Sequence, residues 1–232
     1  MLERARAQLV ALVVPPVCAA CGAGLAIAGE SLCPACRARL PWLTGPRCPR
    51  CALPAPCRPC PARAAAYDRA WAPLAYAGTA RAVVAALKFR GGLALADLMA
   101  AQMTATAPGN LIGDATVVPV PAQRGSRRER GFDQAEWIAR SLAGRSARPL
   151  ARCLRRRGTR HRQVGATRRE RLTPGRIEIQ VHGEPPAAAI LVDDVYTTGA
   201  TLNACARALR AAGTRRVAAI TYARTLAVAR NG

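Results

Sequence analysis

Two adjacent carboxylates, Asp193 and Asp194, end an apolar run in the segment AILVDDVYTTGATLNA (189–204). The run Ala189–Val192 predicts a buried strand, because parallel strands covered on both faces are almost continuously apolar. From Ala200 the apolar positions change to a helical period. The junction is therefore predicted to be a strand–loop–helix turn at the carboxyl end of a strand, where open α/β sheets bind their ligands.

The loop after the acidic pair offers hydrogen-bond donors to an anion; it contains Thr197, Thr198, Gly199, Ala200 and Thr201. Free backbone N–H groups and the positive end of the helix dipole attract phosphate, and the threonine hydroxyls add donors. The segment is not a Walker loop, because it lacks Gly-Lys-Ser/Thr. The two carboxylates can accept hydrogen bonds from vicinal hydroxyls or hold Mg²⁺. Together these groups indicate a phosphorylated ribose as the ligand.

A second set of reactive side chains lies at the other end of the chain. Eight of the ten cysteines form four Cys-x-x-Cys pairs: Cys18 and Cys21, Cys33 and Cys36, Cys48 and Cys51, Cys57 and Cys60. Each pair fits a tight turn that points two sulfurs at one cation, and a tetrahedral zinc site needs two such turns. The eight cysteines therefore predict two structural zinc ions. Four thiolates leave no open position for catalysis.

The cysteine spacing favours zinc sites made of neighbouring pairs, one from the first two pairs and one from the last two. A crossed arrangement, in which the first pair joins the third, stays open. The alternative to zinc is a set of disulfides in a secreted domain. The regular spacing argues against it, as does the absence of a clear signal peptide, since the apolar segment 9–21 lacks a clean cleavage site.

The elements that position these groups divide the chain into two regions, a double zinc ribbon over 1–62 and an α/β domain over 63–232. Strands are expected at 71–78, 115–121, 189–193 and 215–223. Helices are expected at 79–89, 93–103 and 133–142, and from residue 200 onward. This alternation predicts a parallel sheet flanked by helices and joined by right-handed crossovers.

The charge balance predicts anionic partners. The formal net charge is +22, with only 13 acidic residues and a single lysine, Lys88. Such an excess of arginine favours phosphates, nucleic acid or an acidic protein. No membrane span is expected, because 9–21 is too short and is broken by Pro15 and Pro16. A cytoplasmic location is expected.

A basic loop follows the strand expected at 115–121. It contains Arg124, Arg127, Arg128, Arg130 and Gly131. Guanidinium groups are fork-shaped donors that suit a pyrophosphate leaving group. The alternative interpretation of this loop is a solvated basic surface turn.

The segment ILVDDVYTTGAT resembles the phosphoribosyl pyrophosphate (PRPP) signature of type I phosphoribosyltransferases. The resemblance implies that the acidic pair contacts the ribose and that the threonine-rich loop holds the 5-phosphate, with Mg²⁺ bound alongside PRPP. The four cysteine pairs, ALKFRGG (86–92) and VVPVPAQRGSRRERGFDQA (117–135) extend the likeness. Together they resemble the ComF family of competence proteins, in which a double zinc ribbon is fused to a phosphoribosyltransferase domain.

The ComF resemblance implies roles for the remaining basic segments. The loop 124–131 would hold pyrophosphate, Lys88 and Arg90 would belong to a hood over the acceptor, and Thr159 and Gln163 would belong to a mobile lid. The lid segment, 152–172, reads equally as a nucleic-acid grip or as a disordered loop. The chain departs from the family at Asp133, where asparagine is usual, and in lacking a later Arg-x-x-Asn motif.

Two functions from different classes are compatible with these features. The first is transfer of 5-phosphoribosyl from PRPP to a nitrogen nucleophile. The second is a binding module that senses PRPP or a phosphoribosyl nucleotide while its basic surface holds single-stranded DNA or another competence protein. No residue in the sequence identifies an acceptor, and fold alone does not decide between the two.

Overall fold

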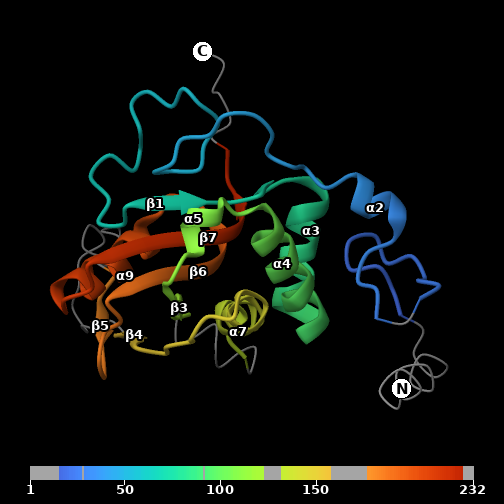
Figure 1. The fold of residues 1–232 in the computed structure, drawn as a ribbon. Helices are drawn as coiled ribbons and strands as arrows, with labels where there is room; N and C mark the ends of the chain where they lie inside the picture. Colours follow the sequence, from blue (N-terminus) through green and yellow to red (C-terminus); the bar gives the residue numbers. More distant parts are fainter. Residues whose placement is uncertain (1–15, 28, 91, 123–131, 158–176, 227–232) are drawn as a thin grey trace, which may run out of the picture.

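The computed structural model describes residues 16–27, 29–90, 92–122, 132–157 and 177–226. Its centre is a parallel sheet in which the strands are ordered β1-β7-β6-β3 (Figure 1). The short strand β2, which follows β1 in the chain, also pairs with β7. These strands are β1 (Arg69–Trp71), β2 (Leu74–Ala75), β3 (Thr116–Pro119), β6 (Ala188–Tyr196) and β7 (Arg216–Arg224). The predicted parallel α/β sheet is confirmed.

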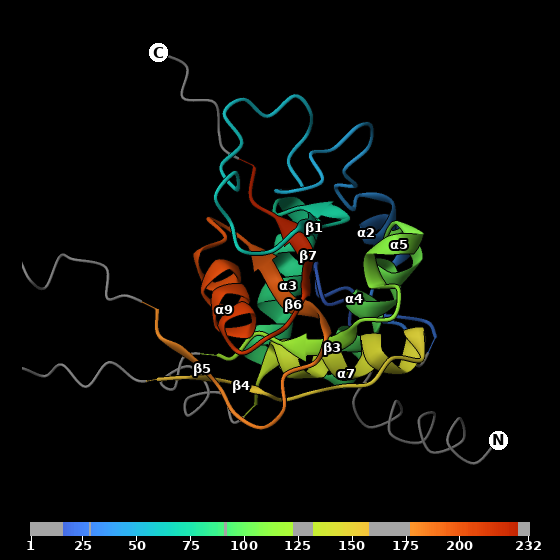
Figure 2. The same ribbon diagram turned by 60° about the vertical axis from the view of Figure 1, so that its left-hand side comes forward.

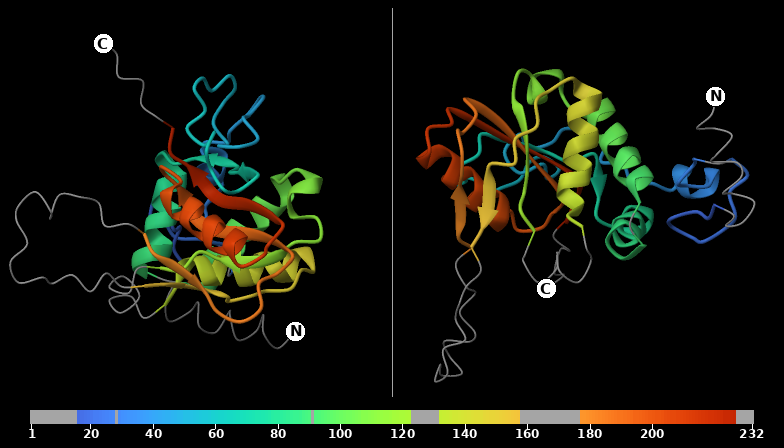
Figure 3. Two further views of the ribbon diagram at one scale, coloured as in Figure 1. Left: turned by 90° about the vertical axis from the view of Figure 1, so that its left-hand side faces the viewer. Right: turned by 90° about the horizontal axis from the view of Figure 1, so that it is seen from below.

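Helices cover both faces of the sheet. The elements of the described chain are α2 (Pro34–Ala38), α3 (Gly78–Arg90), α4 (Leu93–Thr106), α5 (Gly109–Ile112), α7 (Gln134–Ser146) and α9 (Ala200–Ala211). Figures 2 and 3 show α9 on one side of the sheet and α4 with α7 on the other. Two buried clusters result, because alternate side chains of β6 point to opposite faces: Ile190 and Val192 pack toward α3, α4 and α7, whereas Leu191 packs with α9.

Three details differ from the sequence prediction. The strand expected at 71–78 is two short strands, because Pro73 cannot donate to a sheet ladder. The strand expected to end at 193 continues to Tyr196. A small antiparallel sheet, β4 (Leu154–Arg156) with β5 (Ile179–Val181), was not predicted. Its strands have only three residues each, which is too short for an apolar alternation to be recognised in the sequence.

The cysteine-rich segment packs directly onto the sheet domain. Cys18 and Cys36 belong to the buried cluster of α3, α4 and α7, and Cys51 belongs to the cluster of α9. The segment also contacts β2, where Ala75 N–H donates to the carbonyl of Pro41 at 2.9 Å. The boundary that we propose near residue 62 therefore separates two regions with a shared core. Within the described ranges, no helix has the length and hydropathy needed to cross a membrane.

Candidate functional site

The acidic pair lies near the carboxyl end of strand β6. Asp193 pairs in register with Thr221 of β7, and Val120 N–H, just beyond β3, donates to the carbonyl of Val192 at 3.0 Å. The two carboxylates therefore stand at the carboxyl edge of the sheet, beside the chain that leaves β3. The expected turn follows at 197–199. Because β6 continues to Tyr196, the acidic pair belongs to the hydrogen-bonded sheet and not to the loop.

Asp194 forms an ion pair with the only lysine of the chain. The Nζ atom of Lys88, from α3, lies 2.7 Å from Oδ2 of Asp194. Asp194 is 9% exposed, so its charge is largely removed from water and needs this partner. The hood role suggested for Lys88 stays a prediction, and the ammonium of Lys88 lies against Asp194.

Asp193 is directed toward the other face of the sheet. Its Oδ1 accepts the backbone N–H of Asp194 at 2.9 Å, and its charge contributes, after burial, to raising the pKa of Cys205 in α9. Burial, and then the neighbouring charge of Asp194, raise the pKa of Asp193 itself well above the usual carboxyl range. An ionised Asp193 is therefore energetically unfavourable until a hydrogen-bond donor or a cation contacts it.

These groups surround one cavity of about 230 Å³. Its lining includes both carboxylates, Lys88, Thr201 and Gln134, the last residue of the Gly-Phe-Asp-Gln segment. Gln134 is 6% exposed, and its Nε2 has no hydrogen-bond partner within the described residues. A buried amide without a partner costs free energy, so Gln134 provides a donor that a ligand can satisfy. Sequence reasoning did not select Gln134, although the motif contains it.

The loop after β6 leads directly into helix α9, as the sequence predicted for the anion cup. Gly199 is the N-cap of α9 with φ of +79°, and as a glycine it has no side chain of its own to accept the N–H groups at the start of the helix. A Cβ on Gly199 would lie 2.6 Å from Cε2 of Tyr196, so only glycine fits there. Thr197, Thr198 and Ala200 are exposed, and Ala200 N–H donates to Thr198 Oγ1 at 3.3 Å.

A second cavity of about 460 Å³ adjoins the first. Both are lined by Pro121, Ala122, Asp133 and Arg156, and the larger one extends to Arg152, Arg155 and His182. Asp133 is the N-cap of α7 and also accepts the N–H of Ala122 at 3.3 Å. Burial raises the pKa of Asp133. The carboxylate of Asp133 thus holds the chain after β3 onto α7.

Several predicted site residues lie outside the described residues. They are the pyrophosphate-loop candidates Arg124, Arg127, Arg128, Arg130 and Gly131, the lid candidates Thr159 and Gln163, and the side chain of Arg90. The roles suggested for them stay predictions.

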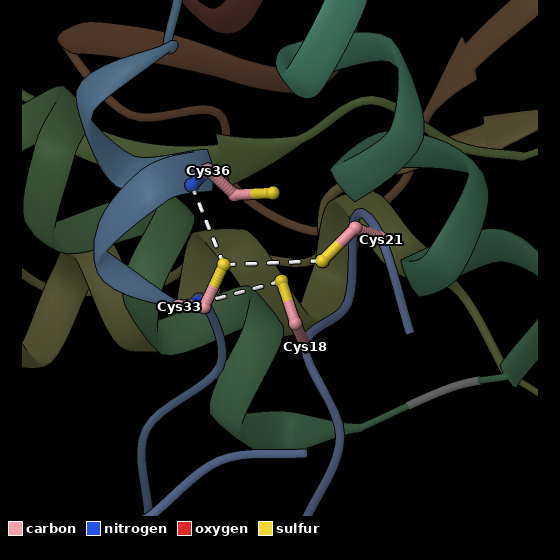
Figure 4. A group of neighbouring side chains, drawn as sticks. All are labelled: Cys18, Cys21, Cys33 and Cys36. Atoms are coloured by element: carbon pink, nitrogen blue, oxygen red, sulfur yellow. Dashed lines mark hydrogen bonds between the residues drawn. The ribbon is translucent and has the colours of Figure 1, made fainter. Parts of the chain in front are cut away.

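The first cysteine cluster has the form of a metal site (Figure 4). The sulfurs of Cys18, Cys21, Cys33 and Cys36 all lie within 4.8 Å of one another, and Cys21 and Cys33 are 3.8 Å apart. Four sulfurs arranged tetrahedrally at about 2.3 Å from zinc are about 3.8 Å apart, so the spacing fits Zn²⁺. Burial opposes ionisation of Cys18, but backbone N–H groups, that of Cys33 first, lower the pKa of its thiol to about 6.

The second cluster begins with the same kind of Cys-x-x-Cys turn as the first, thirty residues further along the chain. Its sulfurs, from Cys48, Cys51, Cys57 and Cys60, also lie within 4.8 Å of one another. In both clusters the residue after the second cysteine has positive φ, +77° at Gly22 and +59° at Ala52. The N–H of each of these residues donates to the carbonyl of the first cysteine of its turn at 2.9 Å. The neighbouring arrangement of pairs is confirmed, and the two clusters fit two structural zinc ions.

The comparisons with known proteins agree with this geometry. Residues 9–68 match the family model of the double zinc ribbon domain. The N-terminal region matches a double zinc ribbon. Over 94 residues the chain is 36% identical to the competence protein ComFC of Bacillus subtilis (strain 168). That alignment covers 40% of this chain and 37% of ComFC. Both findings support a ComF-type protein.

Proposed function

We propose that this chain is a PRPP-binding, phosphoribosyltransferase-like protein of the ComF type that acts in DNA uptake. One observation carries the proposal: Asp193, Asp194, Lys88, Gln134 and Thr201 surround a single cavity at the carboxyl edge of β3 and β6. Helix α9, whose N-cap residue is a glycine without a capping side chain, begins at the same place. The role in DNA uptake follows from the likeness to a protein named for competence.

The cavity suits the two ends of a phosphorylated ribose. The N–H groups at the start of α9 and the hydroxyl of Thr201 would bind the 5-phosphate, because a helix N-terminus favours an anion. Asp193 and Asp194 would accept hydrogen bonds from the ribose hydroxyls. Such bonds would stabilise the ionised form of Asp193, whose pKa is raised in the free protein.

The carboxylates also fit a magnesium ion carried with PRPP. Mg²⁺ binds in proteins through one or two carboxylates plus substrate phosphates. Oδ2 of Asp194 is held by Lys88, which leaves Asp193 as the freer ligand. When bound, the ion would neutralise negative charge on the leaving pyrophosphate.

Transfer would break the bond between C1 of the ribose and pyrophosphate and form a bond from C1 to a nitrogen of the acceptor. The centre passes through a cationic ring, which the negative charge of Asp193 and Asp194 favours. No covalent nucleophile is needed, so the residues act by positioning and electrostatics. The adjoining 460 Å³ cavity has room for a second substrate.

Isothermal titration calorimetry with PRPP and Mg²⁺ tests the proposal. We expect saturable binding at about one PRPP per chain, competed by ribose 5-phosphate, because both ligands share the sugar and the 5-phosphate. A following screen of nucleobases and amines for pyrophosphate release identifies any acceptor. No heat of binding at millimolar PRPP would contradict the proposed function. Binding without turnover would favour the sensing module.

The net charge of +22 favours the second candidate function, single-stranded DNA binding by a competence module. Arg155 and Arg156 have no carboxylate partner within the described residues and line the larger cavity. Binding through such arginines releases counterions, so affinity for an oligonucleotide should fall about tenfold or more between 50 and 200 mM salt. Fluorescence anisotropy with labelled oligothymidine measures this dependence. An affinity that does not change with salt would exclude binding through phosphate contacts.

A further inference from the structure

Arg224, the last residue of β7, is the most deeply buried positive charge among the described residues. It is 4% exposed, and burial lowers its pKa. The described part of the chain places no carboxylate beside it, and its partners are backbone carbonyls and an aromatic ring. A buried cation is costly, and the ionisable groups near it are the Cys51 thiol and the hydroxyls of Tyr196 and Tyr67; an apolar side chain of similar size would fill the same space more cheaply. Its presence therefore calls for a reason other than packing.

The contacts of Arg224 connect two sites that are far apart in sequence. Its Nε donates to the carbonyl of Cys51, a member of the second cysteine cluster, at 2.9 Å. Its Nη1 donates to the carbonyls of Tyr196, at 2.9 Å, and Thr197, where the proposed phosphate loop begins. The guanidinium carbon also lies 4.0 Å from the centre of the Tyr196 ring. One side chain thus holds the loop and the cluster together.

Tyr196 transmits this positioning to the anion cup. Its ring is the surface on which Gly199 rests, since a Cβ there would meet the ring at 2.6 Å. The hydroxyl of Tyr196 forms a 2.5 Å hydrogen bond with that of Tyr67, and the two rings are perpendicular at 6.4 Å. Tyr67 packs in the same buried cluster as Cys51. The ring is therefore fixed by Arg224 and by residues beside the second cysteine cluster.

The link is specific to the second cluster. Cys18 and Cys36 of the first cluster belong to the other buried cluster, with α3, α4 and α7. The backbone of segment 66–68 reinforces the link on the side of α9: Asn203 Oδ1 accepts the N–H of Ala66 at 2.8 Å, and Arg210 donates to the carbonyl of Ala66. The two clusters therefore offer an internal comparison.

We propose that Arg224 is a positioning residue for the phosphate loop 197–201 and that it makes the geometry of this loop depend on metal binding by Cys48, Cys51, Cys57 and Cys60. Its charge lies beneath the loop and adds to the attraction for a phosphoryl group. The part of this inference that concerns ligand affinity rests on the proposed function. The structural link between cluster and loop does not.

Arg224→Lys and Arg224→Met test the link, with Arg216→Met as a matched control at the opposite end of β7, where Arg216 pairs with the exposed Asp114. Hydrogen–deuterium exchange of peptides covering 196–205 needs no ligand. We expect exchange there to accelerate about tenfold in both Arg224 variants, since one or two charge-assisted hydrogen bonds are lost. Affinity for PRPP with Mg²⁺ should fall by a similar or larger factor, and less for lysine, which keeps the charge. The control should change neither.

A pair of cysteine variants tests the dependence on metal. Cys57→Ser and Cys21→Ser should each remove about one zinc ion per chain, measured by plasma mass spectrometry. We expect only Cys57→Ser to accelerate exchange over 196–205. Equal exchange in the two cysteine variants, or unchanged exchange in both Arg224 variants, would overturn the inference. If the wild-type chain binds no PRPP but the exchange pattern is as expected, the link stands and the proposed function fails.

Discussion

Cys36→Ser is expected to lower the zinc content of the chain from about two ions to about one and to destabilise the fold by about 4 kcal/mol or more. Cys36 is 3% exposed within the core that joins the first cluster to α3 and α4, and burial raises the pKa of its thiol to about 12. In this variant three thiols remain close together without zinc, and their mutual repulsion on ionisation takes the place of the favourable metal binding. Differential scanning calorimetry and metal analysis measure the two effects.

Cys153→Ala is the matched control for this prediction. Cys153 is also buried, at 5% exposed, but it lies in neither cluster. Its loss removes one small sulfur from a core, so we expect about 1–2 kcal/mol of destabilisation and no change in zinc content. Disulfide-bonded cysteines and no metal in the purified wild-type chain would contradict the zinc assignment altogether.

The sequence allowed the sheet, the two cysteine clusters and the turn between β6 and α9 to be predicted, because each has a strong local signal. An apolar run followed by a helical period locates β6 and α9, and the Cys-x-x-Cys spacing locates the metal ligands. Ending the strand at Asp193 was wrong, because two charged residues look like a loop in sequence. The ladder between β6 and β7 continues through them.

The contacts between distant segments could not be predicted. Arg224 is one arginine among many, since lysine and arginine together number 35, and nothing local separates it from its solvated neighbours. Its burial depends on the register that pairs it with Tyr196 across β6 and β7. The contact of Lys88 with Asp194 likewise depends on how α3 crosses the sheet. In both cases the sequence shows which residue is present, but its partner is known only once the strands and helices are placed in space.

The two carboxylates of the site are expected to have opposite effects on stability. Asp193→Asn should stabilise the fold at pH 7 by about 1–2 kcal/mol, because burial and Asp194 make the ionised form of Asp193 unfavourable. Asp194→Asn should destabilise it by about 2 kcal/mol, because Lys88 then keeps a partly buried charge without a partner. By thermal melting these are shifts of roughly 4 °C in opposite directions. Both variants should lose PRPP binding.

The pH dependence of the melting temperature is a second test of the stabilisation expected from Asp193→Asn. A carboxyl whose pKa is raised by folding binds its proton more tightly in the folded chain. The wild type should therefore lose stability as the pH rises from about 4, the ordinary carboxyl value, through the raised pKa of Asp193. Asp193→Asn removes this loss, so the difference in melting temperature between variant and wild type should be small at pH 4 and grow toward neutral pH.

Asp97→Asn serves as the control for both carboxylates. Asp97 is also paired with a cation, Arg145 at 2.6 Å, but its side chain is 53% exposed and lies far along the chain from the proposed loop. Exposed pairs contribute about 0–1 kcal/mol, so its loss should change stability little and PRPP binding not at all. Equal destabilisation by Asp193→Asn and Asp194→Asn would show that the two carboxylates share one environment. Melting temperatures that shift in opposite directions, with unchanged PRPP affinity, would confirm the different charge environments of the two carboxylates. They would also show that neither carboxylate belongs to the ligand site.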